Sequence, residues 1–292
     1  MGKTWAAESG MIVLAGARVC GRHAPRPTRP MTTRLDDYQT RYPNARLERT
    51  DGVLEVTLHD GHGGPFVMTA RAHDDLGWLW ADVAADPETG VVLLTGTGAT
   101  FCAANDFGDP GALMTAPAAD ALFDQARRIL QNLLAIEVPV VAAVNGPATI
   151  HADIPLLSDV VLATDTATFQ DANHALGGLS PSDGLHAILP AAIGLTRARY
   201  FLLTGQTLGA AEALRVGLVH EVLAPAALLP RAREVARQLM ALSPATRKYC
   251  RLALNHRMRK ELLARLGAGL AMEGTGLLDL PRELAAPGAA RA

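Results

Sequence analysis

Stretches of alternating and of continuous apolar residues mark the expected strands of this chain. The segment VLEVTLH (53–59) alternates apolar and polar residues, which is typical of a strand with one buried face. The turn sequence RTDG (49–52) joins it to ARLE (45–48), so these segments are expected to form a hairpin. Continuous apolar runs predict strands buried on both faces. Those runs are VVLLTG (91–96), VVAAVNG (140–146) and VVLAT (160–164), followed by a shorter strand, ATFQ (167–170).

Helical periodicity separates these strands. It predicts helices over 70–85 and 118–135, and another that begins at about 153. Strand, turn and helix therefore recur at a spacing of roughly 45–50 residues through the first half of the chain. This recurrence predicts an α/β fold built from stacked β-β-α units with parallel strands.

Beyond about residue 183 the pattern predicts helices only. The helices are expected over 196–205, over 207–217 with a Thr cap and a Gly stop, and over 228–242 and 244–279. No linker divides the chain, so we expect one spiral core over 34–225 and a helical region over 226–284 that packs on neighbouring subunits. Residues 1–33, with their Pro/Arg-rich run, are expected to be a disordered extension or the result of an upstream start codon.

Composition excludes several classes of function. Lys and Arg number 27 against 29 Asp and Glu, and no basic stripe is present, so a nucleic-acid partner is not expected. No apolar run is long enough to span a membrane. Cys20, Cys102 and Cys250 form no C-x-x-C pair, which favours reduced thiols in the cytoplasm. The histidines lack H-x-x-x-H spacing, so no metal site is expected, and no cofactor either.

Three segments, in order, resemble the crotonase (enoyl-CoA hydratase/isomerase) superfamily. They are VVLLTGTGATFCAANDF (91–107), VPVVAAVNGPATIHADIPLLSDVVLATDTATF (138–169) and YFLLTGQTLGAAEALRVGLVHEVL (200–223). The resemblance covers about residues 34–280. It implies a crotonase-like spiral of β-β-α units with C-terminal helices, assembled as a homotrimer or a dimer of trimers. It also implies two backbone N–H groups that form an oxyanion hole for an enolate.

The resemblance places those donors on two motifs. Asn105, in AAND (103–106), takes the position of the first donor. The second motif is NGPATIHADI (145–154), in which the three glycines of the family are replaced and His151 takes the place of the middle one. A histidine at that position is a departure from the pattern of the thioester enzymes.

Two further departures concern the acids. The two glutamates that hydratases use would fall at Ile154 and Asn173, and neither residue can transfer a proton. His174 stands beside the second position, and Asp183 follows nine residues later. This combination resembles the branch of 6-oxocamphor hydrolase and related β-diketone hydrolases, which cleave a C–C bond by a retro-Claisen reaction without coenzyme A.

That branch implies further site residues. His174 and Asp183 would form a His–Asp pair, His151 would be a second catalytic histidine, and Glu273 in AMEG would be the C-terminal glutamate. Met68 would stand where the camphor enzyme has a pocket tryptophan, and its flexible side chain suggests a different or larger diketone.

The chemistry of such a cleavage needs an activated water and a stabilised enolate. Histidine titrates near neutrality, and a carboxylate on its other ring nitrogen fixes the tautomer. We therefore predict that His174 activates water and that Asp183 orients it. The pair would later return the proton to the enolate carbon. His151 would hold a carbonyl of the free diketone, aided by the positive end of a helix beginning near Asp153. Glu273 would bind water or the second carbonyl.

Plainer interpretations stand beside these. Asp183 follows Ser-Pro-Ser and could cap the next helix, and Glu273 could be a solvated helix residue. The other histidines are expected to be surface or satisfied residues: His23, His59, His62, His73, His186, His220 and His256. Two alternative functions also remain: a coenzyme A thioester enzyme with rewired acids, and a non-catalytic member that serves as a structural or binding subunit.

Overall fold

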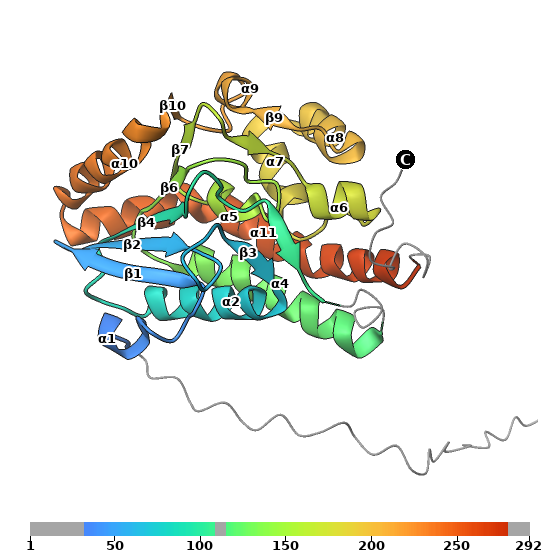
Figure 1. Cartoon of the computed structure of the whole chain (residues 1–292), viewed down its shortest axis with the longest axis horizontal. Coiled ribbons are helices and arrows are strands. Elements are labelled where there is room, and N and C mark those ends of the chain that lie inside the picture. The colour runs from blue at the N-terminus through green and yellow to red at the C-terminus, as the bar shows by residue number, and fades with distance from the viewer. Residues whose placement is uncertain (1–31, 109–114, 280–292) are drawn as a thin grey trace, which may run out of the picture. The chain divides into compact units, whose positions relative to one another are not determined.

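The computed structural model describes residues 32–108 and 115–279 (Figure 1). Within them the main sheet has the strand order β1-β2-β4-β6-β7-β10. Only the β1–β2 pair of this sheet is antiparallel, and the other neighbours run parallel. The strands are β1 (Ala45–Thr50), β2 (Val53–Leu58), β4 (Val91–Gly96), β6 (Val140–Val144), β7 (Val160–Thr164) and β10 (Glu221–Leu223).

Two small sheets accompany the main one. β3 (Val67–Thr69) pairs in parallel with β5 (Ala104–Asp106), and β8 (Thr168–Phe169) pairs antiparallel with β9 (Leu208–Gly209). Helices connect and cover the strands. The described helices are α1 (Leu35–Tyr38), α2 (Ala70–Ala84), α4 (Ala116–Ala135), α5 (Asp153–Leu156), α6 (Ala172–Gly177), α7 (Leu185–Ile193), α8 (Leu195–Thr204), α9 (Ala210–Arg215), α10 (Pro225–Met240) and α11 (Pro244–Asp279).

Both faces of the main sheet are covered, which explains its continuous apolar strands. Val92 and Leu94 of β4 belong to the main core, to which α2 and α4 also contribute. Val91 and Leu93 alternate with them and pack with Leu228 and other residues of α10 on the opposite face. Figure 1 shows α2 and α4 running side by side along the sheet. Because successive strand residues point to opposite faces, a strand between two helical layers must be apolar throughout.

The hairpin prediction is confirmed. β1 and β2 pair from Ala45 opposite Leu58 to Thr50 opposite Val53. Between them Asp51 and Gly52 both have positive φ, at 50° and 79°. Two consecutive residues of this kind form a type I′ turn, whose twist matches that of the flanking strands and for which Asp-Gly is a preferred sequence. The α/β fold class, with its parallel sheet and its C-terminal helices, is likewise confirmed.

The prediction of helices only beyond residue 183 is wrong. β9 and β10 both lie in that part, and β10 extends the main sheet in parallel with β7. The helix expected over 207–217 is shorter than predicted, because Leu208 pairs with Phe169 and the helix α9 starts only at Ala210. Long-range strand pairing here overrides the local helical pattern.

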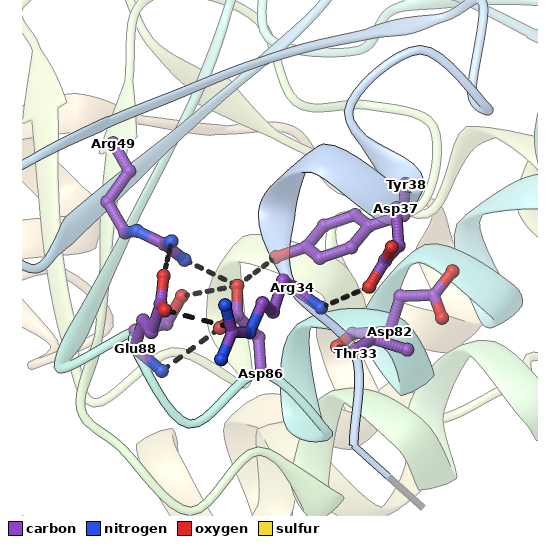
Figure 2. A network of polar contacts seen from close by, with 9 residues as sticks. Thr33, Arg34, Asp37, Tyr38, Arg49, Asp82, Asp86 and Glu88 are labelled. Carbon is purple, nitrogen blue, oxygen red and sulfur yellow. Dashed lines mark hydrogen bonds and ion pairs between the residues drawn. The ribbon is translucent and has the colours of Figure 1, made fainter. Parts of the chain in front are cut away.

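A polar network fixes the start of the described chain (Figure 2). The hydroxyl of Tyr38 donates to Asp86, which also receives Arg49 at 2.5 Å. The Thr33 hydroxyl donates to the carbonyl of Asp82 at 2.8 Å, and Thr33 is buried. The predicted disorder over 1–33 is therefore wrong for Thr33, because this residue is anchored to the end of α2. Residues 1–31 of that prediction lie outside the described residues.

None of the helices in the described ranges is long and apolar enough to cross a membrane.

Candidate active site

Polar and apolar residues from α2, α4, α6, α11, the strand β5 and the intervening loops line a cavity of about 180 Å³. Its polar lining brings together four of the predicted site residues, His151, His174, Asp183 and Glu273, from three separate parts of the chain. The full lining is His73, Asn105, Phe107, Leu122, Phe123, Ala126, His151, Asn173, His174, Leu179, Asp183 and Glu273. We take this cavity as the candidate active site, because titratable groups converge on it.

A tightly bonded turn after β6 presents His151. The N–H groups of Thr149 and Ile150 both donate to the carbonyl of Cys102, at 2.9 and 3.1 Å. His151 itself has a φ of 50°, in the left-handed region that glycine normally occupies. The sequence pattern thus keeps the backbone shape of the glycine turn and places an imidazole on it. The helix expected near Asp153 is only the four-residue α5, so its dipole contributes less than predicted.

Two carboxylates face the imidazole of His151. Nδ1 lies 3.3 Å from Oδ1 of Asp153 and 3.7 Å from Oδ2 of Asp183. These are ion-pair distances without hydrogen-bond alignment. Burial lowers the pKa of this histidine, but the two carboxylates outweigh burial and raise its pKa to about 9. His151 is therefore a cation at neutral pH.

The second histidine has a different orienting partner from the one predicted. Nδ1 of His174 lies 2.5 Å from Oδ1 of Asp171, one turn earlier in the chain. Nε2 lies 3.3 Å from Glu273 and 3.9 Å from Asp183. The prediction that Asp183 orients His174 is therefore wrong, because Asp171 at the start of α6 holds the ring. Glu273 is buried and turned toward the site, so it is not a solvated helix residue.

Carboxylates also control the charge of His174. Burial lowers its pKa, but Asp183, Asp171 and Glu273 raise it well above the ordinary value for histidine. Burial raises the pKa of Asp183 to about 7, although His174 and His151 act in the opposite direction. The resting site therefore holds two imidazolium groups beside a carboxyl group that titrates near neutrality.

His73 of α2 is a functional candidate that sequence reasoning missed. It lines the cavity, and its ring centroid lies 5.1 Å from that of His151. Burial, together with the charge of His151, lowers its pKa to about 3. Nδ1 is hydrogen-bonded to the Gln125 amide oxygen at 3.1 Å. His73 is therefore neutral at all physiological pH values, unlike the two site histidines.

The two predicted substrate-binding residues of the small parallel sheet have different surroundings. Met68 and Asn105 are register partners in β3 and β5. Asn105 lines the cavity, and its side-chain amide donates to Asn173 at 2.5 Å. Met68 is fully buried in the main core and is not among the lining residues. Its assignment to the pocket therefore stays a prediction.

The positions of the two hydratase acids hold no acid here. Ile154 is buried in the main core, and Asn173 contributes an amide to the cavity. Neither side chain can exchange a proton at neutral pH. The carboxylates of this site come instead from Asp153, Asp171, Asp183 and Glu273.

One group of side chains has the geometry to hold a cation. Ligand atoms of His151, Asp153 and Asp183 lie within 4.8 Å of one another, and all three residues are buried. Sequence spacing gave no sign of this group, because its members come from a turn, a short helix and a distant loop. The ion pairs with the imidazolium of His151 account for the arrangement without a metal.

Comparison with known proteins identifies the family. The sequence model described as enoyl-CoA hydratase/isomerase matches residues 48–275. The chain belongs to the enoyl-CoA hydratase/isomerase family. This confirms the superfamily resemblance and the crotonase-like fold.

Two solved structures are similar to this chain. A β-diketone hydrolase from the cyanobacterium Anabaena sp. PCC 7120, bound to (S)-3-oxocyclohexyl acetic acid, has 38% sequence identity and a TM-score of 0.80, covering 83% of this chain and 97% of that chain. An enoyl-CoA hydratase/isomerase from Mycobacterium paratuberculosis has 27% identity and a TM-score of 0.76, with the same coverage of both chains.

Carnitinyl-CoA dehydratase of Escherichia coli strain K12 is 32% identical to this chain over 203 residues. The match covers 68% of this chain and 75% of that protein. The protein is thus an enzyme of the enoyl-CoA hydratase/isomerase family, and the proteins to which it is similar include a β-diketone hydrolase and a coenzyme A enzyme.

Proposed function

We propose that this enzyme hydrolyses a C–C bond of a cyclic or bicyclic β-diketone and releases a keto acid. The observation that carries the proposal is the replacement of the two hydratase acids by a buried cluster of two histidines and several carboxylates around a compact cavity. The similarity to a β-diketone hydrolase that binds a cyclic keto acid supports it. The proposed reaction needs no cofactor.

The size of the cavity favours a small substrate. Cavities of about 150 Å³ accept a molecule as large as benzene, and this one encloses about 180 Å³. A compact ring system with two carbonyl groups fits such a space. The charged histidines then offer donors to the carbonyl oxygens, while the apolar side chains contact the carbon frame.

In the proposed reaction, water adds to one carbonyl carbon and the bond to the central carbon breaks. The electrons of that bond form an enolate on the second carbonyl, and a proton added to its carbon completes the keto acid. The imidazolium of His151 and the backbone N–H of Asn105 stabilise the negative oxygen. Preorganised donors of this type contribute about 3 kcal/mol each to transition-state stabilisation.

The charge states of His174 and Asp183 indicate which of them accepts a proton and which donates one. Since His174 is protonated at rest and Asp183 has a pKa of about 7, Asp183 is the group that can accept a proton from water at slightly alkaline pH. His174 then supplies the proton to the enolate carbon, and Glu273 binds the water. This assignment moves the role of general base from His174 to Asp183 and leaves the return of the proton with His174.

An assay on one preparation tests the proposal. A bicyclic β-diketone is offered and keto-acid release is followed, and crotonyl-CoA is offered in parallel. We expect keto-acid formation that His174→Gln abolishes and that His256→Gln, an exposed histidine on α11, leaves unchanged. Absence of diketone cleavage by the wild-type enzyme would refute the proposal.

The second candidate function is a coenzyme A thioester reaction. The family match and the similarity to carnitinyl-CoA dehydratase favour it. Turnover of crotonyl-CoA alone would establish this candidate and would mean that another residue replaces the acids lost at Ile154 and Asn173. For either reaction we propose a cytoplasmic enzyme, because the three cysteines form no C-x-x-C pair.

A further inference from the structure

The cavity has an apolar wall that the proposed chemistry does not use. Leu122, Phe123 and Ala126 come from one face of α4, and Phe107 and Leu179 continue the same wall. This wall stands beside the titratable cluster but carries no group that could exchange a proton. Its function must therefore lie in the shape and the apolar surface that it offers to a ligand.

Within this wall, the ring of Phe123 packs directly against the backbone of α11 at a glycine. Gly274 is the buried residue that follows Glu273 in α11. A Cβ atom at Gly274 would lie 2.4 Å from Cε2 and 2.8 Å from Cζ of the Phe123 ring, which is closer than real contacts allow. The glycine thus lets the ring approach α11 next to the point where Glu273 enters the cavity.

We propose that Phe123, seated against Gly274, is a specificity-determining residue that limits the size of the substrate's ring system. This inference rests on the proposed function and deepens it. The ring of Phe123 contacts the carbon frame of a compact diketone and excludes a bulkier one. Gly274 sets the ring's position, because any side chain there would push the ring away from α11.

Two diketones of different bulk measure this effect. The first is an unsubstituted bicyclic β-diketone, and the second carries an added phenyl group on the carbon frame. Phe123→Ala removes the ring and enlarges the cavity. We expect the ratio of kcat/KM for the bulky diketone to that for the compact one to rise by about tenfold, the scale on which apolar pockets discriminate added carbon.

Two glycines of the same helix provide a matched pair. Gly274→Ala should displace the Phe123 ring and change the same ratio by about threefold or more. Gly267→Ala is the control, because a Cβ at that exposed glycine meets no atom within 4 Å. Both changes raise helix propensity equally, so a difference between them reports the contact with Phe123.

Different outcomes of these experiments contradict the role of Phe123 and the proposed function. A ratio that stays within about twofold of wild type in folded Phe123→Ala and Gly274→Ala would overturn the inference. If the wild type cleaves neither diketone, the proposed function fails. The wall is then tested by NMR titration with cyclohexanone and 4-phenylcyclohexanone, in which Phe123→Ala should favour the larger ketone. Unchanged relative affinity, or no binding of either ketone, would also overturn the inference.

Discussion

Three buried histidines of one cavity differ in charge because their neighbours differ. His151 and His174 face carboxylates, and their pKa values are raised, whereas His73 faces an amide and the charged His151, and its pKa is lowered. Burial lowers the pKa of all three histidines. The carboxylates therefore decide which imidazoles carry a proton into the reaction.

The pH dependence of the reaction follows from these charges. We expect kcat/KM to rise as Asp183 ionises through a pKa of about 7, and to fall as His151 loses its proton through about 9. Asp153→Asn removes a carboxylate that raises the pKa of His151, so the alkaline limb should move to lower pH. A pH series of initial rates measures both limbs, with Asp120→Asn on the exposed face of α4 as control. An alkaline limb that does not move in Asp153→Asn would contradict the assignment.

Asp171 provides a second prediction for a single residue. Asp171→Asn should lower kcat by about 100-fold, because the ring of His174 loses the carboxylate that orients it and holds its proton. KM should change little, since Asp171 is not among the residues that line the cavity. Steady-state kinetics measure both constants. Wild-type kcat in this variant would show that Asp183 or Glu273 suffices to orient His174.

Sequence reasoning found the site residues that lie on recognisable motifs. His151, His174, Asp183 and Glu273 were placed by resemblance, and the structure brings all four to one cavity. Asp171 was missed, although its spacing three residues before His174 is the signal that could have indicated it. His73 lies on a helix far from any motif, so only the tertiary structure brings it to the cavity.

At the scale of elements, the loop after β4 and the turn after β6 pack against each other and position two residues of the site. Gly146 lies two residues after the end of β6, and a Cβ there would lie 1.8 Å from the carbonyl oxygen of Ala99. The next turn forms bridges from Ala148 to Cys102 and to Phe169. Close backbone packing at Gly146 thus holds the loop before Asn105 against the turn that presents His151.

Gly146→Ala should separate these loops. We expect a loss of about 3 kcal/mol in the free energy of unfolding, because the clash is with backbone that cannot rotate away. Urea unfolding followed by circular dichroism measures the change. Gly209→Ala is the matched control, since a Cβ at that position meets nothing within 4 Å. Equal stability of the two variants would contradict the packing described at Gly146.

Element prediction succeeded where burial on both faces imposed a continuous apolar pattern, as in β4 and β6. It failed at 207–217 because the short strand β9 depends on its partner Phe169, and no local pattern encodes that pairing. The strands β3 and β5 were missed for the same reason. Each of them has three residues, which is too few for a visible alternation.

At the scale of the whole molecule, exposed apolar side chains bear on assembly. Several large ones lie on α8 and α11, and α8 alone exposes Tyr200 and Leu203, the latter to 82%. On α11 the exposed large apolar residues are Tyr249, Leu254, Leu263 and Met272. Surfaces of this kind are typical of contacts between subunits. We propose that copies of this chain cover them in a homotrimer or a dimer of trimers.

Light scattering coupled to gel filtration tests the assembly. The wild type should elute as a trimer or hexamer, and Leu203→Glu combined with Leu254→Glu should shift it toward monomer, because buried charges weaken an apolar interface. Arg257→Glu, at an exposed position of α11, is the charge-change control. A monomeric wild type would contradict the proposed assembly.

The left-handed backbone at His151 has a consequence for how substitutions at this site combine. A return to glycine would relieve the conformational strain of this residue, yet it would leave Asp153 and Asp183 as buried carboxylates without their shared cation. The benefit of the reversion therefore depends on what stands at the other two positions, which is epistasis among three residues. With both acids in place, His151→Gly alone is therefore expected to destabilise the site, whereas the same change beside neutral residues at 153 and 183 is not.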